Sequence, residues 1–342
     1  MIALAIAAAA PAAFAATSNV DVSGKIAVGV ANYSGLDSTK DTLHMESYNS
    51  VVTISGTEDL GGGMNAFFSL TNNLDMGGTA TNFGEQNQIV GVGGSFGKVL
   101  MGKFDNPMKV MARKYDLFAD YIGDNRNLQN VGLTDARADN VVAYLTPSFN
   151  GVSAAIARAN TNQDEVDGAA SGDVLFAKVV YENGPMSIGY GYHKADNSAS
   201  TDEKAQRVVA GYKMGDTRVN LQWQKVDNQG GTAANDSKGL VAGVAHAMGP
   251  ITLKAQYSEY DLDGGSTYDA KQWTIGADYA LSKRTTVMMA YSKLTNESAS
   301  TANILWSVNV PTAGASVSGS DGSVATAGKD PSAFGIALKH TF

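Results

Sequence analysis

The chain ends in a segment where apolar and polar side chains alternate at every residue. Phe334, Ile336, Leu338 and Phe342 share one face of this segment, and the positions opposite carry Gly, Ala, Lys and Thr. Successive side chains on a β-strand point to opposite faces. We therefore predict a strand over 333–342 that has one apolar face and runs to the last residue.

The same alternation recurs along the chain. Val219, Leu221 and Trp223 alternate with polar side chains over 218–224. Trp273 and Tyr279 lie on the apolar face of 272–280. The predicted strands are about 9 to 12 residues long, which is the length that a tilted strand needs to cross a bilayer.

Short and long polar segments separate these strands in strict alternation. Seven short segments are rich in the Gly, Asn, Asp and Pro that tight hairpins require: 58–63, 93–98, 146–151, 182–185, 214–217, 248–250 and 281–284. Eight longer ones lie between them: 32–46, 72–85, 104–138, 160–172, 194–204, 228–237, 262–269 and 296–330. This arrangement gives sixteen strands, with both chain ends on the short-turn side.

The backbone decides the architecture. Every strand N–H and C=O must be paired in lipid, so the sheet has to close on itself. We predict an all-β fold, a 16-stranded antiparallel transmembrane β-barrel whose lumen is too wide for side chains to fill. A soluble β-sandwich or adhesin would show similar alternation. Long, uniform strands and aromatic side chains near strand ends favour the barrel. Four aromatic residues are assigned to a lipid-facing girdle on the outer face: Trp223, Trp273, Tyr279 and Phe342.

Composition narrows the remaining classes. The chain has 342 residues and no Cys, which excludes disulfides, thiolate metal sites and a Cys nucleophile. Its net charge of -8 and pI of 5.0 argue against a nucleic-acid partner. Residues 1–15 are apolar and end in the small-x-small sequence Ala13-Phe14-Ala15, so we predict a secretory signal peptide that lacks its charged start. The barrel would then span 16–342.

Five segments carry a resemblance to a known family. They are 55–64, 94–103, 140–151, 275–285 and the ending 338–342. In this order they resemble the general porins of Gram-negative bacteria, in the branch common among β-proteobacteria. The resemblance implies short periplasmic turns, long extracellular loops and a homotrimer in outer-membrane lipid and lipopolysaccharide. It also implies passive diffusion of ions and small hydrophilic solutes, and a third loop that folds into the barrel and narrows it.

The segment 104–138 is the longest internal one, and loops of this length are usually functional. It carries an apolar patch and three carboxylates four residues apart, Asp116, Asp120 and Asp124. That spacing would place them on one face of a short helix. In a channel they would attract cations and repel anions, although a solvated acidic loop would have the same sequence.

Basic residues with the parity of the lumen are the counterpart of this loop: Lys25, Lys178, Arg207, Arg218 and Lys254, with Lys339 near the end. Some of them could only balance nearby acids. The family often places basic residues on the second and fifth strands, whereas this chain has the neutral Val51, Ser55 and Leu100 there. Together with the net charge of -8, this suggests a weak cation preference.

No motif in the sequence indicates catalysis, a cofactor or a metal site. The four His residues are far apart and have no metal-ligand spacing. A passive general porin is therefore the main hypothesis. One alternative is a substrate-specific channel for sugars or carboxylates, which calls for a lumenal aromatic track or a clustered basic ladder. The other is a barrel without a transport role, either an enzyme with a buried triad or an adhesin with a plugged lumen.

Overall fold

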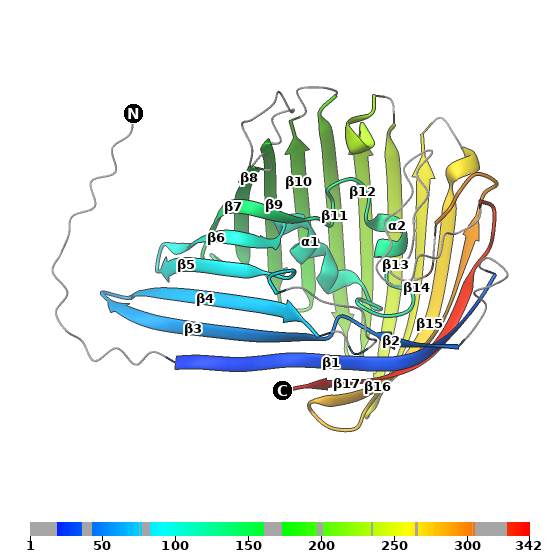
Figure 1. Cartoon of the computed structure of the whole chain (residues 1–342), viewed down its shortest axis with the longest axis horizontal. Coiled ribbons are helices and arrows are strands. Elements are labelled where there is room, and N and C mark those ends of the chain that lie inside the picture. Colours follow the sequence, from blue (N-terminus) through cyan, green and yellow to red (C-terminus); the bar gives the residue numbers. More distant parts are fainter. Residues whose placement is uncertain are drawn as a thin grey trace.

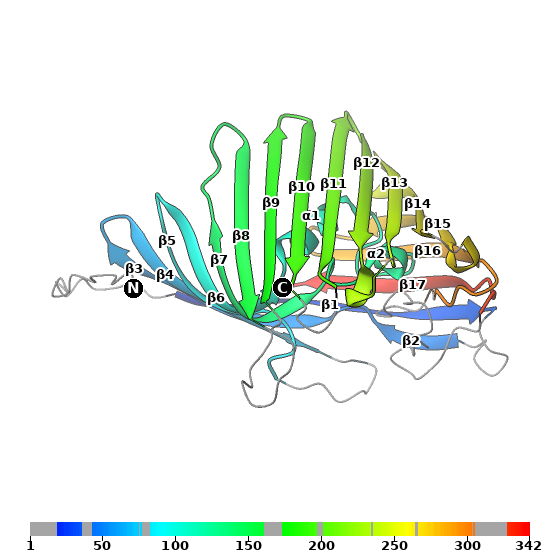
Figure 2. The same cartoon turned by 90° about the horizontal axis from the view of Figure 1, so that it is seen from above.

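The computed structural model describes residues 19–35, 43–74, 76, 83–160, 173–196, 201–233, 235–263, 266–302, 304 and 327–342. The predicted signal peptide, 1–15, lies outside these residues. The described strands form one antiparallel sheet that closes on itself, because β1 (Asn19–Ser34) pairs with β17 (Ser332–Thr341) on one side and with β2 and β3 on the other. Figures 1 and 2 show the strands standing side by side around an open interior.

The strands follow one another around the ring in chain order. After β1 they are β2 (Leu43–Ser47), β3 (Val51–Gly61), β4 (Met64–Asn73), β5 (Gln88–Gly94), β6 (Gly97–Asp105), β7 (Arg137–Leu145), β8 (Val152–Asn160), β9 (Asp173–Asn183), β10 (Met186–Ala195), β11 (Glu203–Met214), β12 (Thr217–Asp227), β13 (Ser237–Met248), β14 (Ile251–Leu262), β15 (Ala270–Ala280), β16 (Thr285–Asn296) and β17. Short 3₁₀ turns, η2 (Gln229–Gly231) and η3 (Ser266–Tyr268), lie at the long-loop end.

β2 and β3 are two halves of a single barrel strand. Both pair with β1, through Val28 with Ser47 and Lys25 with Val51. Tyr48, Asn49 and Ser50 interrupt the ladder between them, and Asn49 has a φ of 49°. Counted in this way the barrel has sixteen strands, which confirms the prediction. The second strand begins at Leu43, inside the stretch predicted to be a loop.

The seven predicted short turns each join two neighbouring strands. The connections from β3 to β4 and from β15 to β16 are examples, and the other five lie at the same end of the ring. Chain closure completes this end, because the Phe342 amide donates to the Gly24 carbonyl and the Gly24 amide donates to the Phe342 carbonyl, both at 3.1 Å. The last residue is therefore part of the closing seam.

The two faces of the barrel differ as the alternation predicts. On β12, Leu221 and Trp223 are exposed on the outer face, whereas Asn220, Gln222 and Gln224 are buried on the inner face. An apolar outer band and a polar interior are typical of a barrel whose lumen holds water. No helix within the described part of the chain is long and apolar enough to span a membrane.

Candidate pore constriction

Residues 106–136 connect β6 to β7, and we call them the inner segment. An ion pair of 3.0 Å between Arg137 and Asp105 closes the base of this segment. Asn106 caps helix α1 (Pro107–Ala112): its Oδ1 accepts from the Lys109 amide at 2.8 Å, and Pro107 occupies the first turn. The Asn106 Nδ2 donates to the Leu133 carbonyl at 2.9 Å, which joins the two ends of the segment.

The inner segment continues through η1 (Arg113–Tyr115) and α2 (Arg126–Gln129) and lies within the ring of strands (Figure 1). Hydrogen bonds attach it to several strands along one arc of the ring. Asn220 of β12 donates to the Tyr115 carbonyl at 3.0 Å, and the Leu117 amide donates to Gln256 of β14 at 2.9 Å. The Tyr121 hydroxyl donates to the Met288 carbonyl of β16 at 3.2 Å. The segment therefore runs along the inside of the wall.

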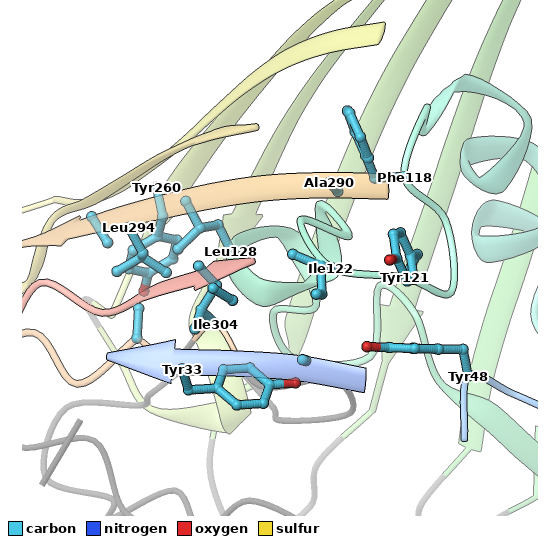
Figure 3. Close-up of a cluster of buried hydrophobic side chains, with 14 of the residues drawn as sticks. Tyr33, Tyr48, Phe118, Tyr121, Ile122, Leu128, Tyr260, Ala290, Leu294 and Ile304 are labelled. Carbon is cyan, nitrogen blue, oxygen red and sulfur yellow. The ribbon is translucent and has the colours of Figure 1, made fainter. Parts of the chain in front are cut away.

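Apolar side chains of the inner segment pack where the inner wall has glycine. A Cβ on Gly276 would lie 2.7 Å from the Phe118 ring, and one on Gly335 would lie 2.4 Å from Ile122. Figure 3 shows Phe118, Tyr121, Ile122 and Leu128 of the segment in one buried cluster with side chains of the wall. Because an added methyl group would clash there, these strand glycines make room for the segment.

The three carboxylates predicted to share a helix face do not lie on a helix. Their stretch forms turns between η1 and α2, and Asp120 has a φ of 59°. Asp116 is buried and accepts hydrogen bonds from the Phe118 and Asn125 amides at 2.9 and 3.0 Å and from Gln256 at 2.9 Å. The prediction that the three carboxylates share one face of a helix was therefore wrong. Asp116 instead stabilises the turn of the segment.

Asp120 and Asp124 lie in a cluster with three basic residues. Asp124 pairs with Arg113 at 3.0 Å and Arg126 at 2.7 Å, and its Oδ2 also accepts from the Asp120 amide. Asp120 pairs with Lys25 of β1 at 3.0 Å and with Arg126 at 3.1 Å, and it also contacts Arg113. The cluster therefore holds three cations and two carboxylates.

The protonation of the three carboxyl groups differs because their surroundings differ. Burial, together with the nearby charge of Asp124, raises the pKa of Asp116 to about 7. Burial would also raise the pKa of Asp124, but Arg126 and Arg113 outweigh it and hold that pKa well below its usual range. At Asp120 burial would again raise the pKa, but the nearby charges of Arg113, Lys25 and Arg126 outweigh it, so the pKa is lowered. Only Asp120 and Asp124 are therefore fully ionised at neutral pH.

The predicted basic residues of the wall separate into different roles. Only Lys25 meets one of the three predicted carboxylates. Arg207 is fully buried and pairs with Asp135 at 2.8 Å, and Lys254 pairs with Asp278 at 2.8 Å. Arg218 donates to the Lys114 carbonyl at 3.1 Å. Within the residues that the structure describes, neither Arg218 nor Lys178 forms an ion pair.

Sequence reasoning missed the basic residues of the inner segment itself. Arg113 and Arg126 supply most of the contacts to Asp120 and Asp124, and Asp135 of the same segment neutralises Arg207. The signal was present in the sequence, since both arginines lie within ten residues of the acidic triplet. The glycines at lumen parity were a second signal, because they mark where a segment lies against the wall.

The four predicted girdle residues all lie on the outside of the barrel. The exposed fraction is 39% for Trp223, 41% for Trp273, 46% for Tyr279 and 40% for Phe342. Trp273 also packs against Tyr291 of the next strand, with ring centroids 5.3 Å apart. Tyr279 and Phe342 lie at strand ends, where a barrel places outward aromatic side chains at the membrane interface, whereas Trp223 lies in the middle of β12.

A closed ring of sixteen strands with an apolar outer face and a polar interior defines a transmembrane β-barrel channel. The chain belongs to the Gram-negative porin family, whose model matches residues 3–299. It is an outer-membrane porin, a channel for passive diffusion.

Three similar proteins illustrate this relationship. Outer membrane porin protein 32 of Delftia acidovorans is 31% identical over 321 residues, which covers 88% of this chain and 90% of that protein. Major outer membrane protein P.IB of Neisseria meningitidis is 26% identical over 259 residues and covers 70% and 75%. The solved anion-selective porin from Comamonas acidovorans superposes with a TM-score of 0.79 at 27% identity, covering 95% of this chain and all of that one. Family membership points to a channel rather than an enzyme.

Proposed function

We propose that the inner segment is the constriction of the channel and that the charges around it favour the passage of small anions. The observation that carries this proposal is the cluster of Lys25, Arg113 and Arg126 around Asp120 and Asp124. One cation is in excess there. The side chains of Lys25, Arg113 and Arg126 are 21–23% exposed, whereas that of Asp124 is 3% exposed. Solvent in the channel therefore meets more positive than negative charge at this point.

The hypothesis of a weak cation preference rested on the total charge of -8 and on neutral residues where the family often has basic ones. The positions of the charges support the opposite preference. Many carboxylates lie at the long-loop ends of the strands, where several pair with lysines: Lys103 with Asp139, Lys194 with Asp202 and Lys238 with Asp263. Charge at an open rim is screened by salt, whereas charge beside a narrow passage acts at short range. The solved relative from Comamonas acidovorans is named an anion-selective porin, which agrees with this proposal.

The proposal extends to assembly and chemistry. We propose a homotrimer in outer-membrane lipid and lipopolysaccharide, with no catalytic activity. Family membership supports both parts, and one structural neighbour, the outer membrane protein OmpT of Vibrio cholerae, is described in a trimer form. That neighbour is 13% identical with a TM-score of 0.69, so its likeness supports the fold and suggests the assembly.

Planar bilayers with the purified protein test these points together. Across a potassium chloride gradient we expect a reversal potential of anion-selective sign, and closure in groups of three steps. The double variant Arg113→Gln and Arg126→Gln should shift the reversal potential toward cation selectivity, because Asp120 and Asp124 then dominate the cluster. Lys98→Gln removes one inner-face cation of β6 outside the cluster, and it measures what the loss of a lumen charge elsewhere does to the potential. A cation-selective wild type would refute the preference, and an unchanged potential in the double variant would refute its source.

A further inference from the structure

A second group of cations lies between the inner segment and the wall at the short-turn end of the barrel. A cavity of about 240 Å³ is hollowed there. Its lining includes Lys114 and Tyr115 of the inner segment, Glu182 of β9, Lys213 of β11 and Arg218 and Asn220 of β12. The site is separate from the cluster around Asp120, since no residue is common to both.

The charges of this cavity are not balanced. Glu182 is its one carboxylate, and it pairs with Lys114 at 3.1 Å. Lys213 and Arg218 face each other directly across β11 and β12, and within the described part of the chain neither forms an ion pair. Like charges directly opposite each other on neighbouring strands destabilise a sheet. A bound anion between them would remove that repulsion.

Tyr115 supplies an independent indication. Its side chain lines the cavity and is only 4% exposed, yet its hydroxyl has no hydrogen-bond partner among the described residues. A buried hydroxyl without a partner costs free energy, and native proteins rarely leave one. Its ring packs at Gly211, where the Ser187 hydroxyl also lies. Hydroxyl and cationic donors therefore lie close to one another around this cavity.

An adjoining cavity has a different balance of charges. Arg218 also lines a space of about 290 Å³ together with Lys254, and this space includes Asp116 and Asp216 in its lining. Asp216 offsets one of the two cations, the partly ionised Asp116 offsets part of the other, and Lys254 is already paired with Asp278. An anion would therefore favour the cavity beside Tyr115 over its neighbour.

We propose that the cavity bounded by Lys114, Tyr115, Lys213 and Arg218 binds the carboxylate or phosphate group of a small organic anion at the short-turn end of the channel. Arg218 offers the fork of donors that matches either oxyanion, since only one contact, to the Lys114 carbonyl, uses its guanidinium in the described structure. The volume is below that of pockets for drug-sized ligands, so the ligand is small. Such a site would hold an anion on one side of the inner segment during passage.

Saturable block of chloride current is the measurement that tests this site. Inorganic phosphate and succinate are added separately to the short-turn side of oriented channels in potassium chloride, at constant ionic strength. We expect at least one of the two anions to block the current, with half-maximal block at a defined concentration. Block by phosphate shows that the site binds a phosphate group, and block by succinate shows that it binds a carboxylate. Arg218→Gln should raise that concentration roughly tenfold, and Tyr115→Phe should raise it by a smaller factor.

Lys339→Gln is the matched control. Lys339 lies on the inner face of β17, near the same end of the barrel but outside the cavity. Its substitution by Gln removes one positive charge, as Arg218→Gln does. It should leave the half-maximal concentration unchanged. Resistance to unfolding in dodecyl sulfate confirms that each variant is folded. Absence of saturation with both anions, or equal shifts in Arg218→Gln and Lys339→Gln, would overturn the site while leaving the chloride selectivity of the constriction intact.

Discussion

Two parts of the inner wall have similar alternation in sequence but different surroundings in the structure. The covered wall, the inner face of β10–β16, lies behind the inner segment and is largely buried. Its amide side chains are hydrogen-bonded, Gln256 to Asp116 of the segment and Gln272 to Ser292 of the wall. The open wall, the inner face of β3–β6, carries small polar side chains that stay partly exposed, together with Phe67 and Lys98. Thr53 and Thr71 there bond to each other at 2.9 Å.

The comparison shows that lumen parity alone does not make a residue part of the channel surface. Arg207 has lumen parity but is fully buried behind the segment, whereas Lys25 has the same parity and stays partly exposed at the constriction. The covered wall acts as a folding interface, where buried polar groups must be satisfied. The open wall leaves the water-filled passage. Substitutions matched between the two walls should therefore have different effects.

The largest difference is expected at the buried ion pair. Arg207→Met on the covered wall leaves Asp135 charged, buried and without its partner, and it removes the donors to Gln129 and Gln224. Loss of one partner of a buried pair costs about 3–5 kcal/mol. Lys98→Met on the open wall should cost less than about 1 kcal/mol. Urea unfolding in detergent, followed by tryptophan fluorescence, measures both.

A smaller difference between the two walls is expected when a glycine of the inner face is replaced by a larger residue. Gly243 of β13 faces Leu117, and a Cβ there would lie 2.9 Å from the Leu117 Cδ1, so Gly243→Val must push the segment away. Such overpacking costs about 1–3 kcal/mol. Gly93 of the open wall has no neighbour nearer than 3.1 Å, and Gly93→Val should have little effect. Equal losses of unfolding free energy in the two variants would show that the segment does not press on β13.

A further effect is expected in the pH dependence of stability. The pKa of Asp116 is about 7 in the folded protein and near 3.8 in the unfolded chain. Between these values the folded state binds more protons, so its contribution to stability falls as the pH rises from about 4 to 7. Asp116→Asn should flatten the decrease in unfolding midpoint between pH 5 and 8. An unchanged pH profile would contradict a protonated Asp116.

The sequence predicted the barrel because strands and turns are local. Period-2 alternation placed Trp223 outside and Gln224 inside, and the Gly- and Asn-rich turns located all seven hairpins. The inner segment could not be predicted in the same way. Its conformation depends on strands more than a hundred residues away, such as the contact between Leu117 and Gln256. Spacing of four suggested a helix for Asp116 and Asp124, but they accept hydrogen bonds from backbone amides of the segment's turns, and Asp116 also accepts one from the distant Gln256.

The interruption at Tyr48, Asn49 and Ser50 has a consequence for which side of the barrel each residue faces. Before it, even-numbered residues such as His44 and Glu46 have lumen parity, and after it odd-numbered residues such as Val51 do. The extra residue thus resets the phase of the strand. Deletion of this one extra residue would leave a regular strand in which both halves keep their faces, whereas the gain or loss of one residue within either half would turn part of the strand to the wrong face. Insertions and deletions should therefore be tolerated in the adjacent long loop but not within the paired parts of β2 and β3.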